Sequence, residues 1–194
     1  MKTKLTTLAV VVLASSELVL VLLSWVLSAT STGYVRSLLS SEGIRWFLGH
    51  YAEIVLSPLL VWIVLLSVSC GVVSASRVLA PATSYRERMG RRVALTLLLL
   101  YVAAVLSLVL APHAILLSAS GSVLPSPFSK AFVPIVAFGM LIGAVAYGVV
   151  ARTLSSLRAI IDAMLKGISM GAPFLLCYLL LAQFVESLRF VFGG

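Results

Sequence analysis

One carboxylate stands inside a long apolar stretch of this sequence. Glu17 lies within residues 5–27, among mostly aliphatic neighbours. An ionisable group at that depth of a bilayer costs at least about 2.5 kcal/mol on insertion scales, so it usually pairs internally or marks an ion pathway. Glu17 is therefore the ion-coupling candidate, for a proton or a sodium ion. We favour the alternative, a neutral Glu17 satisfied by Ser15, Ser16 or another helix, because no second acid lies at comparable depth.

The other reactive side chains do not form a recognisable catalytic or metal-binding pattern. His50 and His113 are far apart, and Cys70 and Cys177 lie in apolar stretches without a CxxC spacing. The sequence therefore predicts no catalytic residue, no metal and no cofactor. The many serines leave an intramembrane enzyme as a distant alternative, because serine in a span usually packs or bonds to backbone.

Polar side chains suited to binding a solute are scarce. The chain has no asparagine and a single glutamine, Gln183. Secondary transporters line their binding sites with broken helices and polar side chains, and the one expected break here is at 171–173, Gly-Ala-Pro. This shortage argues against a complete solute-binding site.

Five apolar stretches must position these residues. A helix crosses the hydrocarbon core with roughly 20 apolar residues, and the stretches of about that length are 5–27, 54–73, 93–110, 132–150 and 168–184. The chain is 61% hydrophobic and 10% charged, whereas soluble domains carry about 25% charged residues. We therefore predict an all-α integral membrane helical bundle, with residues 1–194 as a single membrane domain. The first stretch is longer than the roughly 7–15 apolar residues of a signal peptide, so we interpret it as a span.

A sixth helix is expected on the cytoplasmic side, over 154–166. Arg158, Asp162 and Lys166 recur every four residues and share one helix face. This pattern indicates an amphipathic helix lying on the membrane surface or packed under the bundle. The favoured interpretation of its charges is a solvated face with weak ion pairs, each contributing about 0.3–0.5 kcal/mol.

The basic residues predict the topology. Ten of the fourteen Lys and Arg fall before the first span, in 74–92 and in 151–167, and these segments alternate with connectors that are poor in them. By the positive-inside rule, the N-terminus and both basic connectors are cytoplasmic and the C-terminus lies outside. The net charge of +8 therefore reflects basic residues placed on the cytoplasmic side of the lipid bilayer. No nucleic-acid partner is expected.

Small residues at four-residue spacing mark faces where helices can approach closely. These pairs are Gly139 with Gly143, Ser67 with Gly71, and Gly167 with Gly171. Packing within one chain and formation of a homodimer remain equally open for them.

Several short motifs occur in an order that resembles one transporter family. Residues 41–47 read SEGIRWF, 126–134 read SPFSKAFVP, 146–148 read AYG, 171–173 read GAP and 182–184 read AQF. Their order and spacing resemble those of the p-aminobenzoyl-glutamate transporter (AbgT) family, over roughly 42–184. The resemblance implies a transport-related, dimeric protein of the bacterial inner membrane.

The sequence also departs from that family's pattern. The resemblance would place a re-entrant hairpin and an acid–lysine pair near Ser74 and Ala75, and an asparagine just after 182–184; none of these is present. No family binding residue can therefore be carried over. The interpretation is a scaffold or dimerising remnant of a small-organic-anion or drug transporter, or its partner subunit. The expected partners are a second copy, a full-length transporter or a separately encoded second half. The alternative is a short, self-sufficient ion-coupled transporter using Glu17.

Overall fold

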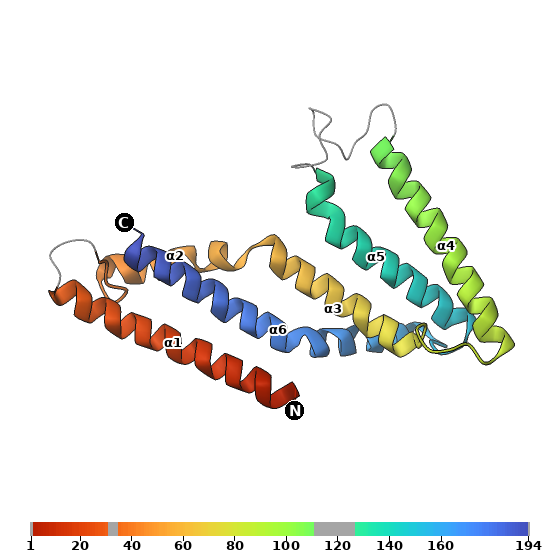
Figure 1. The fold of residues 1–194 in the computed structure, drawn as a ribbon, viewed down its shortest axis with the longest axis horizontal. Coiled ribbons are helices and arrows are strands. Elements are labelled where there is room, and N and C mark those ends of the chain that lie inside the picture. Colours follow the sequence, from red (N-terminus) through yellow and green to blue (C-terminus); the bar gives the residue numbers. More distant parts are fainter. Residues whose placement is uncertain (1, 31–34, 111–126, 194) are drawn as a thin grey trace. The chain divides into compact units, whose positions relative to one another are not determined.

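A computed structural model describes residues 2–30, 35–110 and 127–193, and these residues form helices joined by short connectors (Figure 1). All but α2 are long and apolar enough to cross a membrane. The predicted all-α fold with five candidate spans is therefore confirmed. In chain order, the helices are α1 (Lys2–Thr30), α2 (Ser41–Val55), α3 (Pro58–Ser76), α4 (Tyr85–Leu110), α5 (Pro127–Val150) and α6 (Leu157–Phe192).

Local sequence signals account for several helix ends. Ser40 caps α2 by accepting a hydrogen bond from the Gly43 N–H at 3.0 Å. Pro58 opens α3, where its missing N–H costs no helical bond. Ser84 and Glu87 form a reciprocal capping box at the start of α4, with bonds of 3.2 and 3.0 Å. These ends follow from residue type and position alone.

The structure departs from the expected division of the last part of the chain. The predicted amphipathic segment, 154–166, is helical only from Leu157, and from there it forms one helix of 36 residues with the fifth span, α6, which continues through Pro173. Proline removes one helical hydrogen bond, a loss that membrane helices tolerate. The helix also continues through Gly167, which packs closely against α3: a Cβ there would lie less than 3.0 Å from the Ser67 carbonyl oxygen.

The contacts group the chain into two compact units, which we describe separately. The first unit covers 1–60 and 172–194, and it contains α1, α2 and the C-terminal half of α6. Its buried core is formed by Leu20, Leu38, Phe190 and Val191, with Trp46 and Phe184 among the side chains packed around them. In Figure 1, α1 and this half of α6 run side by side.

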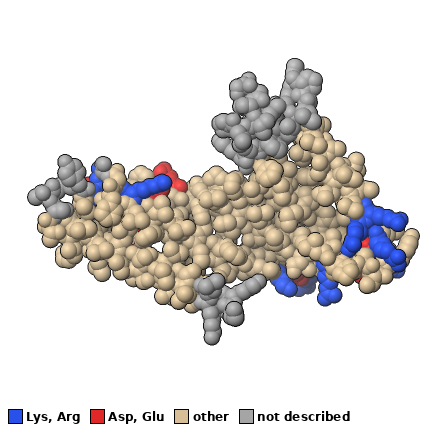
Figure 2. Space-filling view, viewed as in Figure 1, with Lys and Arg blue, Asp and Glu red and all other residues tan. Residues whose placement is uncertain are grey.

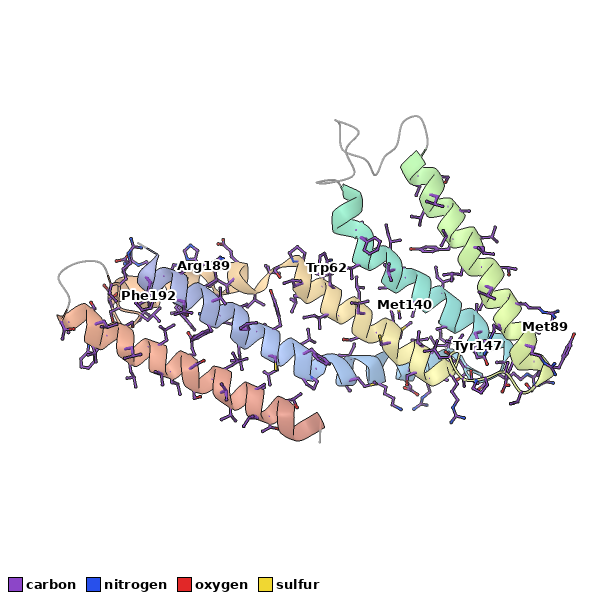
Figure 3. All side chains as sticks on the ribbon, viewed as in Figure 1. Trp62, Met89, Met140, Tyr147, Arg189 and Phe192 are labelled. Atoms are coloured by element: carbon purple, nitrogen blue, oxygen red, sulfur yellow. The ribbon has the colours of Figure 1, made fainter. Side chains whose placement is uncertain are left out.

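The second unit covers 61–171. Its core is small, formed by Val72, Ala144, Leu154 and Ala163. Tyr147, labelled in Figure 3, is 2% exposed, and a Cβ on Gly90 would lie 3.2 Å from its carbonyl oxygen. Helices α4 and α5 therefore approach closely where α4 begins and α5 ends.

Basic side chains gather at one end of the second unit. Figure 2 shows Lys and Arg clustered over the region where α4 begins. Arg77 and Arg152, which follow the ends of α3 and α5, both adopt a left-handed backbone with φ of 58°. The Thr153 hydroxyl donates to the Ser76 carbonyl oxygen at 3.1 Å, so one of the last carbonyl groups of α3 is satisfied there.

Candidate functional site: a polar network between the first and last helices

The partner of Glu17 comes from α6. The Ser187 hydroxyl donates a 2.7 Å hydrogen bond to Glu17 Oε1. Ser187 is fully buried, and Glu17 is half-buried. Ser15 and Ser16 do not supply this bond, because their hydroxyls donate to the carbonyl groups of Val12 and Leu13 in their own helix. The bond therefore ties α1 to α6 within the first unit.

Gln183 extends the network along α6. It precedes Ser187 by one helical turn, so both side chains lie on the same helix face. Its Nε2 donates to Ser187 Oγ at 3.2 Å, and the residue is 6% exposed. The hydrogen bonds thus run in one direction, from the Gln183 amide through the Ser187 hydroxyl to the Glu17 carboxyl group.

Two oxygen atoms at the ends of this network are left over. Glu17 Oε2 and Gln183 Oε1 are buried and have no hydrogen-bond partner among the described residues. A buried polar atom without a partner costs about 1–3 kcal/mol. Both atoms are acceptors, so the network lacks a donor or a cation.

Sequence reasoning found only part of this network. It singled out Glu17, and it noted Gln183 as the one glutamine without giving it a role. Ser187 was not considered, since serine is common in the apolar stretches. The available signal was the four-residue spacing of two polar side chains in an apolar helix, 183 and 187, which predicts a shared face.

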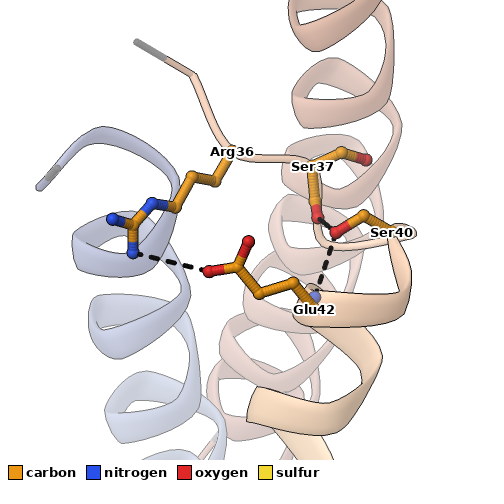
Figure 4. A network of polar contacts seen from close by, with 5 residues as sticks. Arg36, Ser37, Ser40 and Glu42 are labelled. Atoms are coloured by element: carbon orange, nitrogen blue, oxygen red, sulfur yellow. Dashed lines mark hydrogen bonds and ion pairs between the residues drawn. The ribbon is translucent and has the colours of Figure 1, made fainter. Parts of the chain in front are cut away.

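Outside the network, an aromatic and charged cleft of about 450 Å³ lies between the segment 36–50, which includes most of α2, and the C-terminal end of α6. The Trp46 and Phe190 rings stack with centroids 4.5 Å apart, and the Arg36 guanidinium lies 5.8 Å from the Phe190 ring. Figure 4 shows Arg36 reaching Glu42 at 3.9 Å beside the Ser40 cap. Both partners of that ion pair are exposed, so it adds little stability. The cleft is lined by Arg36, Glu42, Arg45, Trp46, His50, Glu186, Arg189, Phe190 and Gly193.

The predicted small-residue faces meet in the second unit. A Cβ on Gly71 would lie less than 3.0 Å from the Gly167 backbone, and one on Gly171 would collide with the Ser67 side chain. The faces of α3 and α6 therefore pack against each other within one chain. Nearby, the Ser69 hydroxyl donates to the Ala137 carbonyl oxygen of α5 at 2.8 Å.

Gly139 and Gly143 face different surroundings. A Cβ on Gly139 would meet the Tyr101 ring of α4 at 3.1 Å, whereas one on Gly143 would have nothing within 4 Å. Tyr101 also donates to the Ile135 carbonyl oxygen at 2.9 Å, so Gly139 belongs to the α4–α5 packing. Of this pair, only Gly143 leaves its face open among the residues that the structure describes.

The remaining candidate residues are not brought to a common site. His50 Nδ1 lies 3.2 Å from the Trp46 carbonyl oxygen of its own helix, and His113 lies outside the described residues. Among the residues that the structure describes, no group of three or more His, Cys, Asp or Glu side chains is arranged to hold a metal ion. Arg158, Asp162 and Lys166 are exposed on α6.

Comparison with known proteins places this helical arrangement in a family. A family model matches residues 74–191, more than half of the chain. The chain belongs to the AbgT putative transporter family. Gln183 and Ser187 fall inside the matched region, whereas Glu17 falls outside it.

One curated relative shows the extent of the likeness. The chain is 32% identical over 100 residues to the p-aminobenzoyl-glutamate transport protein of Escherichia coli (strain K12). The matched part is 51% of this chain and 20% of the relative, so the chain spans only about a fifth of that protein's length. No solved structure matches the chain. The family supports a transport-related membrane protein, as the sequence motifs predicted.

Proposed function

We propose that this AbgT-family chain is a scaffold or dimerising subunit of a transporter of small organic anions or drugs, and that it has no enzymatic activity. It works with a second copy of itself, with a full-length transporter or with a separately encoded second half. We place it in the bacterial inner membrane, with the N-terminus in the cytoplasm and the C-terminus outside, following the arrangement of its arginines.

The use of polar side chains inside the apolar helices supports this proposal. Ser187 bonds to Glu17 across α6 and α1, and Ser69 bonds to the backbone of α5. The Ser24 hydroxyl oxygen accepts a 3.1 Å hydrogen bond from the Leu38 N–H, which holds the segment before α2 against α1. These groups join elements to one another, which is what a framework needs.

A second candidate function is ion-coupled transport by this chain alone. The observation that favours it is the unsatisfied Glu17 Oε2, which is a possible ligand for a coupling ion inside an apolar helix. In that case Glu17 would gain and lose its ion during transport.

Reconstitution separates the two functions. The purified chain is placed in liposomes under a proton or sodium gradient, with labelled p-aminobenzoyl-glutamate as the probe because the E. coli relative is named for it. A scaffold gives no gradient-driven uptake alone, and it co-purifies with a full-length family transporter when the two are expressed together. Uptake by the chain alone that vanishes in Glu17→Gln would overturn the scaffold proposal in favour of the second function.

A further inference from the structure

The network of Glu17, Ser187 and Gln183 contains two acceptor atoms without a hydrogen-bond donor. Ser187 already donates its only proton to Glu17 Oε1, and Gln183 Nε2 already donates to Ser187. The two atoms without partners, Glu17 Oε2 and Gln183 Oε1, sit on the residues at opposite ends of this chain of bonds. A hydrogen bonded to Glu17 Oε2 would supply the network with the donor that it lacks.

We propose that Glu17 is a proton-binding site in the membrane, and that its proton, carried on Oε2, is donated to Gln183 Oε1. A proton from water forms an O–H bond with the carboxylate, and Glu17 loses its negative charge. Each of the three side chains then both donates and accepts a hydrogen bond, so the network closes into a ring. This inference is independent of whether the chain acts as a scaffold or transports by itself.

A metal cation fits the same place less well. Hard cations are held by about six or more oxygen ligands, and by an ionised carboxylate where charge must be balanced. The network offers two free oxygens and the Ser187 hydroxyl, which already makes two hydrogen bonds. One proton needs a single donor atom and a single acceptor, which the two leftover oxygens provide.

Among the residues that the structure describes, the charged groups of the first unit's α2 and α6 segments do not form an ion pair with Glu17. On α6, Arg189 pairs with Glu186 at 2.6 Å. On the segment before α2 and on α2 itself, Arg36 pairs with Glu42, and Arg45 and His50 line the aromatic cleft. Within 6–30 of α1, Glu17 is the only charged residue.

Infrared spectroscopy of the protein in lipid bilayers tests this assignment directly. At neutral pH, the wild-type spectrum minus the Glu17→Gln spectrum should contain the C=O band of a protonated carboxyl group, and this band should move in D₂O. Gln183→Leu and Ser187→Ala should each shift the band, because each removes one of its hydrogen bonds. Ser15→Ala, whose hydroxyl bonds only within α1, should leave it in place.

Three results would overturn the proposal. The difference spectrum could contain only carboxylate bands, which would mean an ionised Glu17. The protonated band could disappear when sodium chloride replaces choline chloride, which would identify a cation site. The carboxyl band could also stay unchanged in both Gln183→Leu and Ser187→Ala, which would exclude the ring. These two variants test the proposal even if the Glu17→Gln protein cannot be produced in sufficient amount.

Discussion

Ser187 on α6 donates a 2.7 Å hydrogen bond to Glu17 Oε1 on α1, across 170 positions of the chain. The serine is fully buried, so its hydroxyl cannot exchange this partner for water without opening the helix packing. The bond makes Glu17 part of the framework of the first unit, and several of its consequences can be measured.

The first prediction concerns the hydrogen-bond acceptor that the side chain at position 17 supplies to Ser187. Glu17→Ala should lower the free energy of unfolding in detergent by about 1–3 kcal/mol, because the Ser187 hydroxyl loses its acceptor while buried. Glu17→Gln keeps an oxygen acceptor and adds an N–H donor, so it should cost less than about 1 kcal/mol. Thermal unfolding followed by circular dichroism measures both. Ser15→Ala is the matched control, and equal losses in all three variants would contradict the role of the network.

The second prediction concerns the contact between α3 and α6. Gly71→Leu should prevent correct packing, because even a Cβ there lies less than 3.0 Å from the Gly167 backbone, which cannot move aside as a side chain can. Gly143→Leu is the control and should keep the monomer fold, because no described residue lies within 4 Å of a Cβ at that position. Yield of non-aggregated protein on size-exclusion chromatography is the measurement. A well-folded Gly71→Leu variant would show that this close contact does not form.

The helices and their contacts differ in how far the sequence predicts them. The five spans were predictable because apolar length is a local property, and the cap at Ser40 follows from residue type. The continuity of α6 through Gly167 was not, because a glycine is compatible both with a helix end and with a close contact such as the one it makes with Ser67 of another helix. Glycine and proline are only potential helix breaks, and α6 continues through both Gly167 and Pro173.

The candidate site shows the same limit. Glu17 was evident from the sequence because a carboxyl group in an apolar stretch is costly. Its partner was not, because Ser187 resembles many other serines in apolar stretches, including Ser15 and Ser16, which bond to their own helix. Among the described serines, only the pairing of α1 with α6 distinguishes Ser187 as the partner of Glu17.

The third prediction concerns topology. Alkaline phosphatase is active only outside the cytoplasm, so a fusion after Gly194 should be active and a fusion near Ser84 inactive. The physical reason is the positive-inside rule, applied to the arginine cluster that includes Arg86, Arg88 and Arg91. Colony colour and enzyme assay report the outcome. Activity at both positions, or the reverse pattern, would contradict the five-span orientation.

The last prediction concerns the homodimer. Gly143 is half-buried, and no other atom of the described chain lies within 4 Å of the Cβ that it lacks. Small residues let membrane helices approach closely, so we expect this face of α5 to contact the second copy. Gly143→Leu should then shift the mass in mild detergent from dimer towards monomer while circular dichroism stays unchanged. Gly139→Leu, which meets the Tyr101 ring of its own chain, should instead reduce stability. A wild-type protein that is monomeric in mild detergent would refute the dimer, and a dimer untouched by Gly143→Leu would place the contact on another helix.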